Sequence, residues 1–181
     1  SSVANSATVY EKWFFDGTGR LKGVYTDGGL LDISSDIRIF GKKWESSADL
    51  NPWTLSSVDY EKSLVNTRKW MAILPFAGKA VKLSQSAVEN ADGSLSINVE
   101  AINVPLNDIE EVQFVIRLSP HEFAGGVVVI SGNSGDSSVL LPAQTPPEPR
   151  LSVSSDARKV EIRRIDGSAT ITLMLSNPAK C

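Results

Sequence analysis

Short runs of alternating apolar and polar residues, most of them followed by a glycine-containing turn, recur along this chain of 181 residues. The clearest run spans residues 94–102 (SLSINVEAI), and a second spans residues 80–88 (AVKLSQSAV). Successive side chains of a β-strand point to opposite faces of a sheet, so both runs predict half-buried strands. The turn between them, NADG at 90–93, predicts an antiparallel hairpin. The residues expected on the buried faces are Val81, Leu83, Gln85, Ala87, Leu95, Ile97, Val99 and Ala101.

The same pattern extends over the rest of the chain. Residues 111–118 (EVQFVIRL) and 125–130 (GGVVVI) predict two more strands, and residues 159–165 and 169–175 predict a second hairpin around an Asp-Gly turn. One strand face is expected to carry Val112, Phe114, Ile116 and Leu118. The candidate core residues of the second hairpin are Val160, Ile162, Ile171, Leu173 and Leu175. The best helix candidate is residues 56–65, which fit a long loop equally well.

Roughly ten such runs, with almost no helix signal, predict an all-β fold. We expect an antiparallel two-sheet β-sandwich of the jelly-roll-like kind, with a closed β-barrel as the alternative. The whole chain, 1–181, is expected to form one domain. The proline-rich segment 140–150 (LLPAQTPPEPR) cannot donate a regular ladder of hydrogen bonds, so it is expected to be a crossover between strands.

Charge and composition exclude several classes of function. The formal net charge is −3 and the pI is about 5.2, so the chain lacks the basic surface that neutralises phosphates, and nucleic acid is not an expected partner. The longest apolar stretches are far too short to cross a bilayer, so no membrane partner is expected either. The single cysteine, Cys181, excludes an internal disulfide and cysteine-based zinc sites.

The only histidine, His121, stands beside Glu122 in SPHEFAGG (119–126). An acid–base interpretation needs a nucleophile and an orienting group within reach, and neighbouring residues on a chain do not supply that geometry. Pro120 and the glycine pair that follows instead predict a corner between two strands. We therefore expect His121 to be a turn residue.

Two further kinds of candidate site are paired carboxylates and a loop that carries calcium ligands. Asp32 and Asp36 would share a strand face about 13 Å apart, which is too far for the direct cooperation of a glycosidase pair. Glu110 and Glu111 are expected in solvent, so a catalytic pair would have to form across strands whose register the sequence does not reveal. No cofactor is expected. A structural calcium ion remains an alternative, because the loop at residues 131–138 (SGNSGDSS) carries ligand oxygens on Asn133, Ser134 and Asp136.

Aromatic residues give the main functional signal. Three tryptophans and a tyrosine fall within residues 44–70 among polar and turn-forming residues, a spacing that is unlike strand alternation into a core. Flat rings with a polar edge suit stacking on the apolar faces of pyranose sugars, while polar neighbours bind the hydroxyl groups. The alternative for each ring is an anchor in a loop or the core. The expected ligand-binding residues are Trp44, Trp53, Tyr60, Trp70, Asp49, Asn51, Asp59 and Arg68.

Several features of the chain occur together: Asp-Gly and Gly-Gly turns, scarce cysteine and histidine, tryptophan-bearing loops and a proline-rich connection. The segments concerned are GGLLDISSDIRIFGKKW, GKAVKLSQSAV, VQFVIRLSPHEFAGG and TPPEP. In these features the chain resembles the β-sandwich modules of secreted bacterial enzymes that degrade polysaccharides. The resemblance implies a secreted or cell-surface location and a non-catalytic role, with carbohydrate as the partner and a covalently linked catalytic domain as a further partner.

Three hypotheses for function follow. The first is a carbohydrate-binding or accessory domain in polysaccharide degradation, which is not itself an enzyme. The second is a glycoside hydrolase or polysaccharide lyase that uses an acidic pair formed across strands. The third is a structural domain that packs on a partner through an apolar sheet face.

Overall fold

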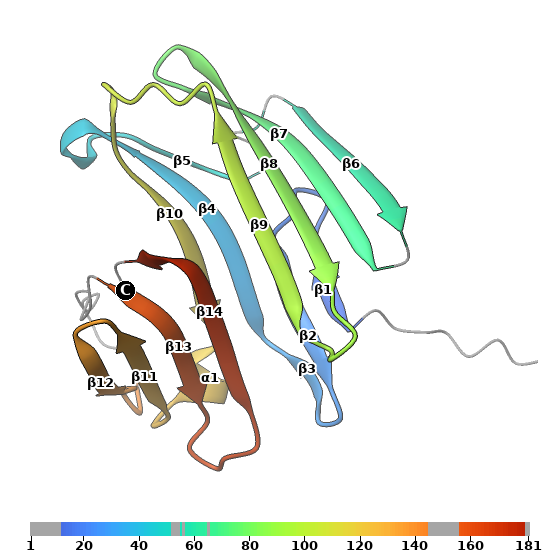
Figure 1. Cartoon of the computed structure of the whole chain (residues 1–181), viewed down its shortest axis with the longest axis vertical. Helices are drawn as coiled ribbons and strands as arrows, with labels where there is room; N and C mark the ends of the chain where they lie inside the picture. Colours follow the sequence, from blue (N-terminus) through green and yellow to red (C-terminus); the bar gives the residue numbers. More distant parts are fainter. Residues whose placement is uncertain (1–11, 52–54, 56, 65, 145–155, 180–181) are drawn as a thin grey trace, which may run out of the picture. The chain divides into compact units, whose positions relative to one another are not determined.

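The computed structural model describes residues 12–51, 55, 57–64, 66–144 and 156–179. The chain divides into two compact units, unit 1 (Ser1–Arg117) and unit 2 (Leu118–Cys181), and each is described by itself (Figure 1). The expectation that the chain forms one domain stays a prediction. Of the proline-rich segment 140–150, residues 145–150 lie outside the described part.

Unit 1 is built almost entirely of strands. Its elements are β1 Trp13–Phe15, β2 Leu21–Thr26, β3 Gly29–Leu31, β4 Ile33–Gly41, a 3-10 turn η1 Lys42–Trp44, β5 Ser47–Asp49, β6 Ser57–Leu64, β7 Thr67–Phe76, β8 Lys79–Glu89, β9 Leu95–Ile102 and β10 Ile109–Leu118. These strands form three antiparallel sheets, with the orders β1-β2-β3, β10-β4-β5 and β6-β7-β8-β9.

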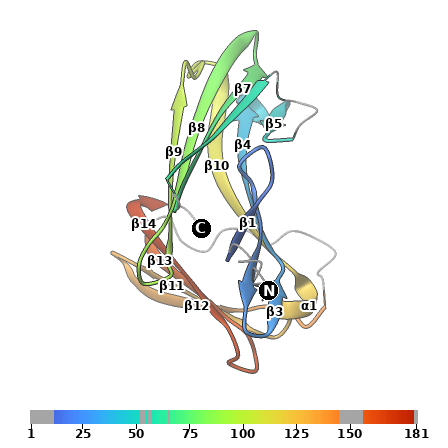
Figure 2. The ribbon, with the colours of Figure 1, turned by 90° about the vertical axis from the view of Figure 1, so that its right-hand side faces the viewer.

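Two of these sheets pack face to face, which makes unit 1 the predicted antiparallel β-sandwich (Figure 2). The core between them draws on both layers, because apolar residues of β4, β5 and β10 meet apolar residues of β7 and β8. Its buried members are Ile37, Ile39, Ala48, Leu50, Ala72, Leu74, Phe76, Val81, Leu83 and Ile109. In the described part of the chain, none of the sheets closes into a barrel.

The predicted hairpin between β8 and β9 is confirmed. The two strands pair antiparallel from Glu89↔Leu95 to Lys82↔Ile102. All four positions expected on the inner face of β8 are buried, and they include the polar Gln85. The inner face of β9 is less buried than expected, because β9 is the edge strand of its sheet: Leu95, Ile97 and Ala101 are partly buried, and Val99 is exposed.

The three-stranded sheet β1-β2-β3 covers the remaining part of the inner face of β7 and β8. The Phe15 ring lies 4.9 Å from the Trp70 ring, centroid to centroid, and the side-chain amide of Gln85 donates a hydrogen bond to the Gly19 carbonyl oxygen. The Ser35 hydroxyl accepts a hydrogen bond from the Leu21 amide at 2.9 Å, which links β2 to β4. The sheet of β6 to β9 is therefore covered by β4 and β5 toward Phe76 and by β1 and β2 toward Trp70.

One expectation is corrected, and one predicted apolar face is found to be partly exposed. Residues 57–64 form strand β6, neither a helix nor a loop, with Tyr60 paired to Trp70 of β7. An even spacing such as that of positions 60 and 64 fits the alternation of a strand as well as the period of a helix, so the sequence pattern does not distinguish the two. In β10, Val112 and Phe114 are exposed by 44% and 46%, while Ile109 enters the core. The opposite sheet covers the face of β10 that carries Ile109, whereas Val112 and Phe114 lie on the other face.

Unit 2 is a four-stranded antiparallel sheet with the order β12-β11-β13-β14. Its elements are α1 Pro120–Phe123, β11 Val127–Gly132, β12 Gly135–Leu140, β13 Ala157–Arg163 and β14 Thr170–Ala179. The second predicted hairpin is confirmed by the pairing of β13 with β14. Val160 and Ile162 are buried as expected, whereas Ile171, Leu173 and Leu175 are only partly buried. The segment SPHEFAGG forms the predicted corner, in which α1 is a single helical turn and His121 is exposed.

We predict that Gly19→Ala destabilises unit 1 by about 2–4 kcal/mol. The added Cβ would lie 3.1 Å from two ring atoms of Trp70, and Gly19 has a φ of +91°, which strains any other residue. Gly17→Ala is the matched control in the same turn, because its Cβ would meet nothing within 4 Å and its φ is not positive. Denaturant unfolding should leave Gly17→Ala within about 0.5 kcal/mol of the parent. Equal losses for the two variants would contradict the close packing of Gly19 on Trp70.

Candidate functional site

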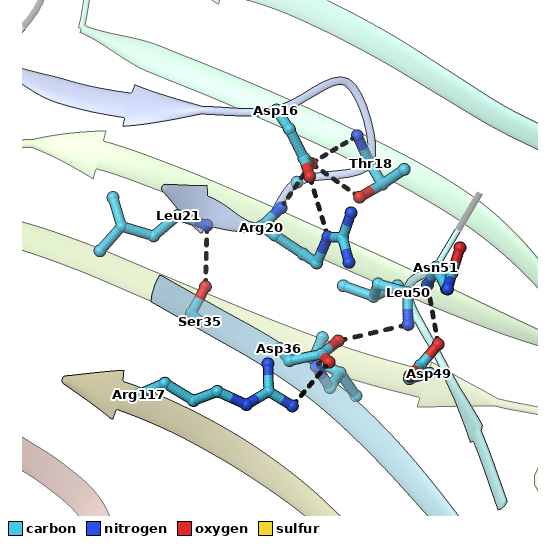
Figure 3. A network of polar contacts seen from close by, with 12 residues as sticks. Asp16, Thr18, Arg20, Leu21, Ser35, Asp36, Asp49, Leu50, Asn51 and Arg117 are labelled. Carbon is cyan, nitrogen blue, oxygen red and sulfur yellow. Dashed lines mark hydrogen bonds and ion pairs between the residues drawn. The ribbon is translucent and has the colours of Figure 1, made fainter. Parts of the chain in front are cut away.

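The site is built on the turn that joins β1 to β2. One carboxylate oxygen of Asp16 accepts hydrogen bonds from the Thr18 amide at 2.9 Å, the Thr18 hydroxyl at 2.7 Å and the Arg20 amide at 3.1 Å. The other oxygen accepts a charged hydrogen bond from Nε of Arg20 at 2.8 Å. Figure 3 shows these contacts around a single carboxylate. The Asp-Gly-Thr sequence thus fixes the turn with its own side chains.

Asp16 is held in its ionised form by these contacts. Burial alone would raise the pKa of its carboxyl group, but the hydrogen bonds from Thr18 and Arg20 together outweigh burial and lower the pKa below its ordinary value. The charge of Asp16 is therefore already matched inside the turn.

The fixed turn packs against the inner face of β7 and β8. Because Gly19 has no side chain, its backbone reaches the Trp70 indole and the Gln85 amide. Trp70 is only 3% exposed. The turn therefore closes over a tryptophan in the middle of the sheet, next to the edge strand β6.

Three aromatic rings meet at this point. The ring centroids of Phe15 and Tyr60 lie 4.9 Å and 5.4 Å from that of Trp70, with interplanar angles of 36° and 33°. Tyr60 lies on the edge strand and is 53% exposed, so part of its ring faces solvent. The arrangement gives a half-open aromatic surface on a buried aromatic support.

Arg68 lies beside the rings and is almost fully buried. Its Nη1 donates a hydrogen bond to the Trp13 carbonyl oxygen at 2.8 Å, its Nη2 lies 3.7 Å from the Glu89 carboxylate, and its Cζ lies 5.4 Å from the centroid of the Phe15 ring. A buried guanidinium needs such partners, because an unpaired charge in the interior is costly. Arg68 therefore joins β1 to β7 and supports the wall of the site.

Between the turn and the sheet lies a hollow of about 180 Å³. Its lining consists of Phe15, Asp16, Gly17, Tyr60, Arg68 and Trp70. Gly17 is exposed, and no described residue forms a hydrogen bond with its backbone amide or carbonyl group. The hollow thus combines aromatic surface with peptide groups that are free to bind a polar ligand.

Two buried polar atoms near this hollow have no hydrogen-bond partner among the residues that the structure describes: Nε1 of Trp70 and Oε1 of Gln85. The two residues are direct cross-strand partners. Each unsatisfied buried group costs about 1–3 kcal/mol. Buried polar groups are nearly always hydrogen-bonded, and Nε1 of Trp13 and Nε of Arg38 are unsatisfied as well, so this feature is not confined to the hollow.

The structure brings together three of the predicted ligand-binding residues, Tyr60, Arg68 and Trp70. Trp70 is a buried support, so the core alternative applies to it more than direct stacking does. The other lining residues, Phe15, Asp16 and Gly17, were not predicted. Their only signal in the sequence is the Asp-Gly turn after an aromatic pair, which does not show what it packs against.

Trp44 lies elsewhere on unit 1. It belongs to η1, is 55% exposed, and its ring centroid lies 4.9 Å from that of Phe40. A Cβ on Gly41, just before η1, would lie 3.3 Å from Phe76, at the opposite end of β7 from Trp70. Six residues along a strand span about 20 Å, so Trp44 and the hollow are separate. Lys43 and Trp44 have φ values of 55° and 62°, which are unfavourable for residues other than glycine.

The remaining predicted residues do not line the hollow. Asp49 accepts a hydrogen bond from the Asn51 amide at 2.9 Å, so it orders the end of β5 (Figure 3). Asp59 is exposed on β6 next to Tyr60, and strand alternation directs the two side chains to opposite faces. Trp53 lies outside the described residues.

The acidic residues weighed as catalysts take other roles. Asp32 is exposed, whereas Asp36 is 2% exposed and accepts hydrogen bonds from the amides of Ile37 and Leu50 (Figure 3). Arg38 and Arg117 lie 3.6 Å and 3.5 Å from its carboxylate. Asp36 thus ties β4 to β5 and β10. In the described ranges, no three histidine, cysteine or acidic residues gather as they would around a metal ion.

A second hollow lies in unit 2 at the SPHEFAGG corner. It is lined by Leu118, Ser119, Pro120, Phe123, Ala124, Leu141, Pro142 and Gln144. No charged side chain belongs to this lining, and His121 does not belong to it either. A binding site needs a few polar groups that converge on the ligand, so the hollow of unit 1 is the better candidate.

We predict that Asp16→Asn lowers the free energy of unfolding by about 1–2 kcal/mol at pH 7, because the charged acceptor of four hydrogen bonds is lost. The pKa of Asp16 is lowered in the folded state, so its stabilisation is present above the ordinary carboxyl pKa, near 3.8, and is lost as pH falls through the lowered value. Denaturant titrations from pH 7 to about pH 2.5 should show the difference from the parent shrinking below about pH 4.

Asp92→Asn is the matched control, because Asp92 makes the same hydrogen bonds to Ser94 in the β8–β9 turn but is exposed and bonds to no arginine. We expect a smaller loss for Asp92→Asn at pH 7. A loss for Asp16→Asn that does not change with pH would contradict the role of its ionised form.

Comparisons of the chain with known protein families, with curated protein sequences and with solved structures find no match. No helix among the described residues is long and apolar enough to cross a membrane. The function is therefore inferred from the geometry of the site in unit 1.

Proposed function

We propose that this chain is a non-catalytic carbohydrate-binding β-sandwich, and that a sugar ring binds in the hollow against Tyr60. The single observation that carries the proposal is the half-exposed Tyr60 ring, stacked on the buried Trp70 beside exposed peptide groups. A pyranose offers an apolar face to an aromatic ring and hydroxyl groups at its rim, and the hollow offers the matching surfaces.

The supports of Tyr60 favour binding over a purely structural role. Trp70 fixes one side of the ring, and the turn of Asp16 is held by its own hydrogen bonds. A ring and a wall that are already ordered lose little conformational entropy when a ligand binds. The hydroxyl group of Tyr60 and the backbone of Gly17 are then the groups that can bond to sugar hydroxyls.

The biological setting belongs to the same proposal. A module that binds glycans but does not cleave them has its use beside a catalytic domain that acts on the same polysaccharide, so we propose a covalently linked enzyme domain as its partner. Its place would be outside the cell or on the cell surface, where polysaccharides are met. The resemblance to bacterial accessory modules supports this setting.

We predict that Tyr60→Ala weakens glycan binding about thirtyfold, because loss of a stacking ring costs on the order of 2 kcal/mol of binding free energy. Tyr60→Phe keeps the ring and should lose much less. The matched control is Phe14→Ala, since Phe14 is 50% exposed, nearly as much as Tyr60, and does not line the hollow. The measurement is retention on a panel of soluble and insoluble polysaccharides, with melting temperatures recorded for every variant.

The outcomes separate the three hypotheses. Retention that Tyr60→Ala abolishes and Phe14→Ala preserves, with unchanged melting temperatures, is expected. Release of reducing ends by the parent protein during the same incubation would replace the proposal with the hydrolase hypothesis. No retention on any glycan would leave the structural interaction domain.

A further inference from the structure

We propose that the hollow at Tyr60 recognises one electrically neutral sugar ring, and not an anionic sugar or an extended stretch of a chain. This inference rests on the proposed function and adds the class of ligand. It follows from the charges around the hollow, from its size and from the place of its one exposed ring.

The charges of the lining are matched within the protein. The Asp16 carboxylate is paired with Arg20 at 2.8 Å, and the Arg68 guanidinium is paired with Glu89 at 3.7 Å and bonded to the Trp13 carbonyl oxygen. Together these four side chains carry two positive and two negative charges, so their sum is zero. A uronate or sulfate group would have to lose its hydration without gaining an unmatched cation, which is unfavourable.

The acidic neighbours of Tyr60 on β6 do not line the hollow. Strand alternation directs the side chains of Asp59 and Glu61 to the opposite face of the sheet, where Glu61 is the cross-strand partner of Lys69. They therefore do not change the balance of charge inside the hollow.

The size of the hollow limits the ligand to one ring. Pockets that enclose a drug-sized ligand measure roughly 300–1,000 Å³, whereas this hollow measures about 180 Å³. Tyr60 is also the only strongly exposed ring in its lining, because Phe15 is half-buried and Trp70 is buried. One exposed ring offers one stacking position, and Trp44 lies too far away to provide the next one.

The test is a calorimetric titration of the full chain with methyl glycosides of glucose, galactose, mannose and xylose. Three comparisons follow for the glycoside that binds: its uronic acid counterpart with the C6 carboxylate, its oligosaccharides of two to six units, and the same titration between 20 and 500 mM NaCl. Tyr60→Ala and Phe14→Ala are titrated in parallel as the site variant and its control.

We expect the neutral methyl glycoside to bind at least tenfold more tightly than its uronate. We also expect less than about a threefold gain in affinity from one to six units, and a dissociation constant that salt does not change. Tyr60→Ala should weaken this binding about thirtyfold and Phe14→Ala should retain it. Tighter binding of the uronate, or an affinity that rises tenfold or more with chain length, would overturn this inference while the proposed function stands. No binding of any glycoside or oligosaccharide would overturn both.

Discussion

The close approach of the Gly19 backbone to the Trp70 indole is the contact on which the packing around the candidate site in unit 1 depends. It allows a tight turn to cover a large aromatic residue in the middle of the sheet of β6 to β9, where the other cover, β4 and β5, does not reach. Any side chain at Gly19 would lift the turn from the ring. Without that cover, the Trp70 indole, the Gln85 amide and the Arg68 guanidinium would lose their partners or their burial together.

The candidate site is a by-product of this packing. The hydrogen bonds of Asp16 fix the conformation of the β1–β2 turn. The exposed Gly17 of this turn is thereby held in place opposite the edge strand β6, across a small hollow. Trp70 supports Tyr60 from below, and the inner sandwich core around Leu74 and Val81 stabilises the sheet independently of the site. Because the core is separate from the site, the region around the hollow can contain polar groups without hydrogen-bond partners, such as Nε1 of Trp70, at limited cost to the stability of the fold.

The sequence predicted the strands best where alternation and turn chemistry agree, as in β8 and β9, where four inward positions and an Asp-Gly turn were identified. It failed for residues 57–64, because the even spacing of Tyr60 and Leu64 fits a helix and a strand alike. It also predicted that Trp44, Tyr60 and Trp70 belong to one aromatic cluster, whereas Trp44 lies apart from the other two. Nearness in the chain put Trp44 with Tyr60, but along β7 the position of Trp70 and that of Phe76, near Trp44, are about 20 Å apart. Phe15 and Gly17 had no local signal, since only the tertiary fold brings them to Trp70.

The most direct test of the whole account is an NMR titration of the isotope-labelled chain with the neutral methyl glycoside that binds most tightly. The account predicts that the largest shift changes occur at the Gly17 amide and the Tyr60 ring, with smaller changes at the Trp70 indole and none around Trp44. Saturating changes centred on Trp44, on the exposed face of β10 or in unit 2, with Gly17 and Tyr60 unmoved, would contradict it.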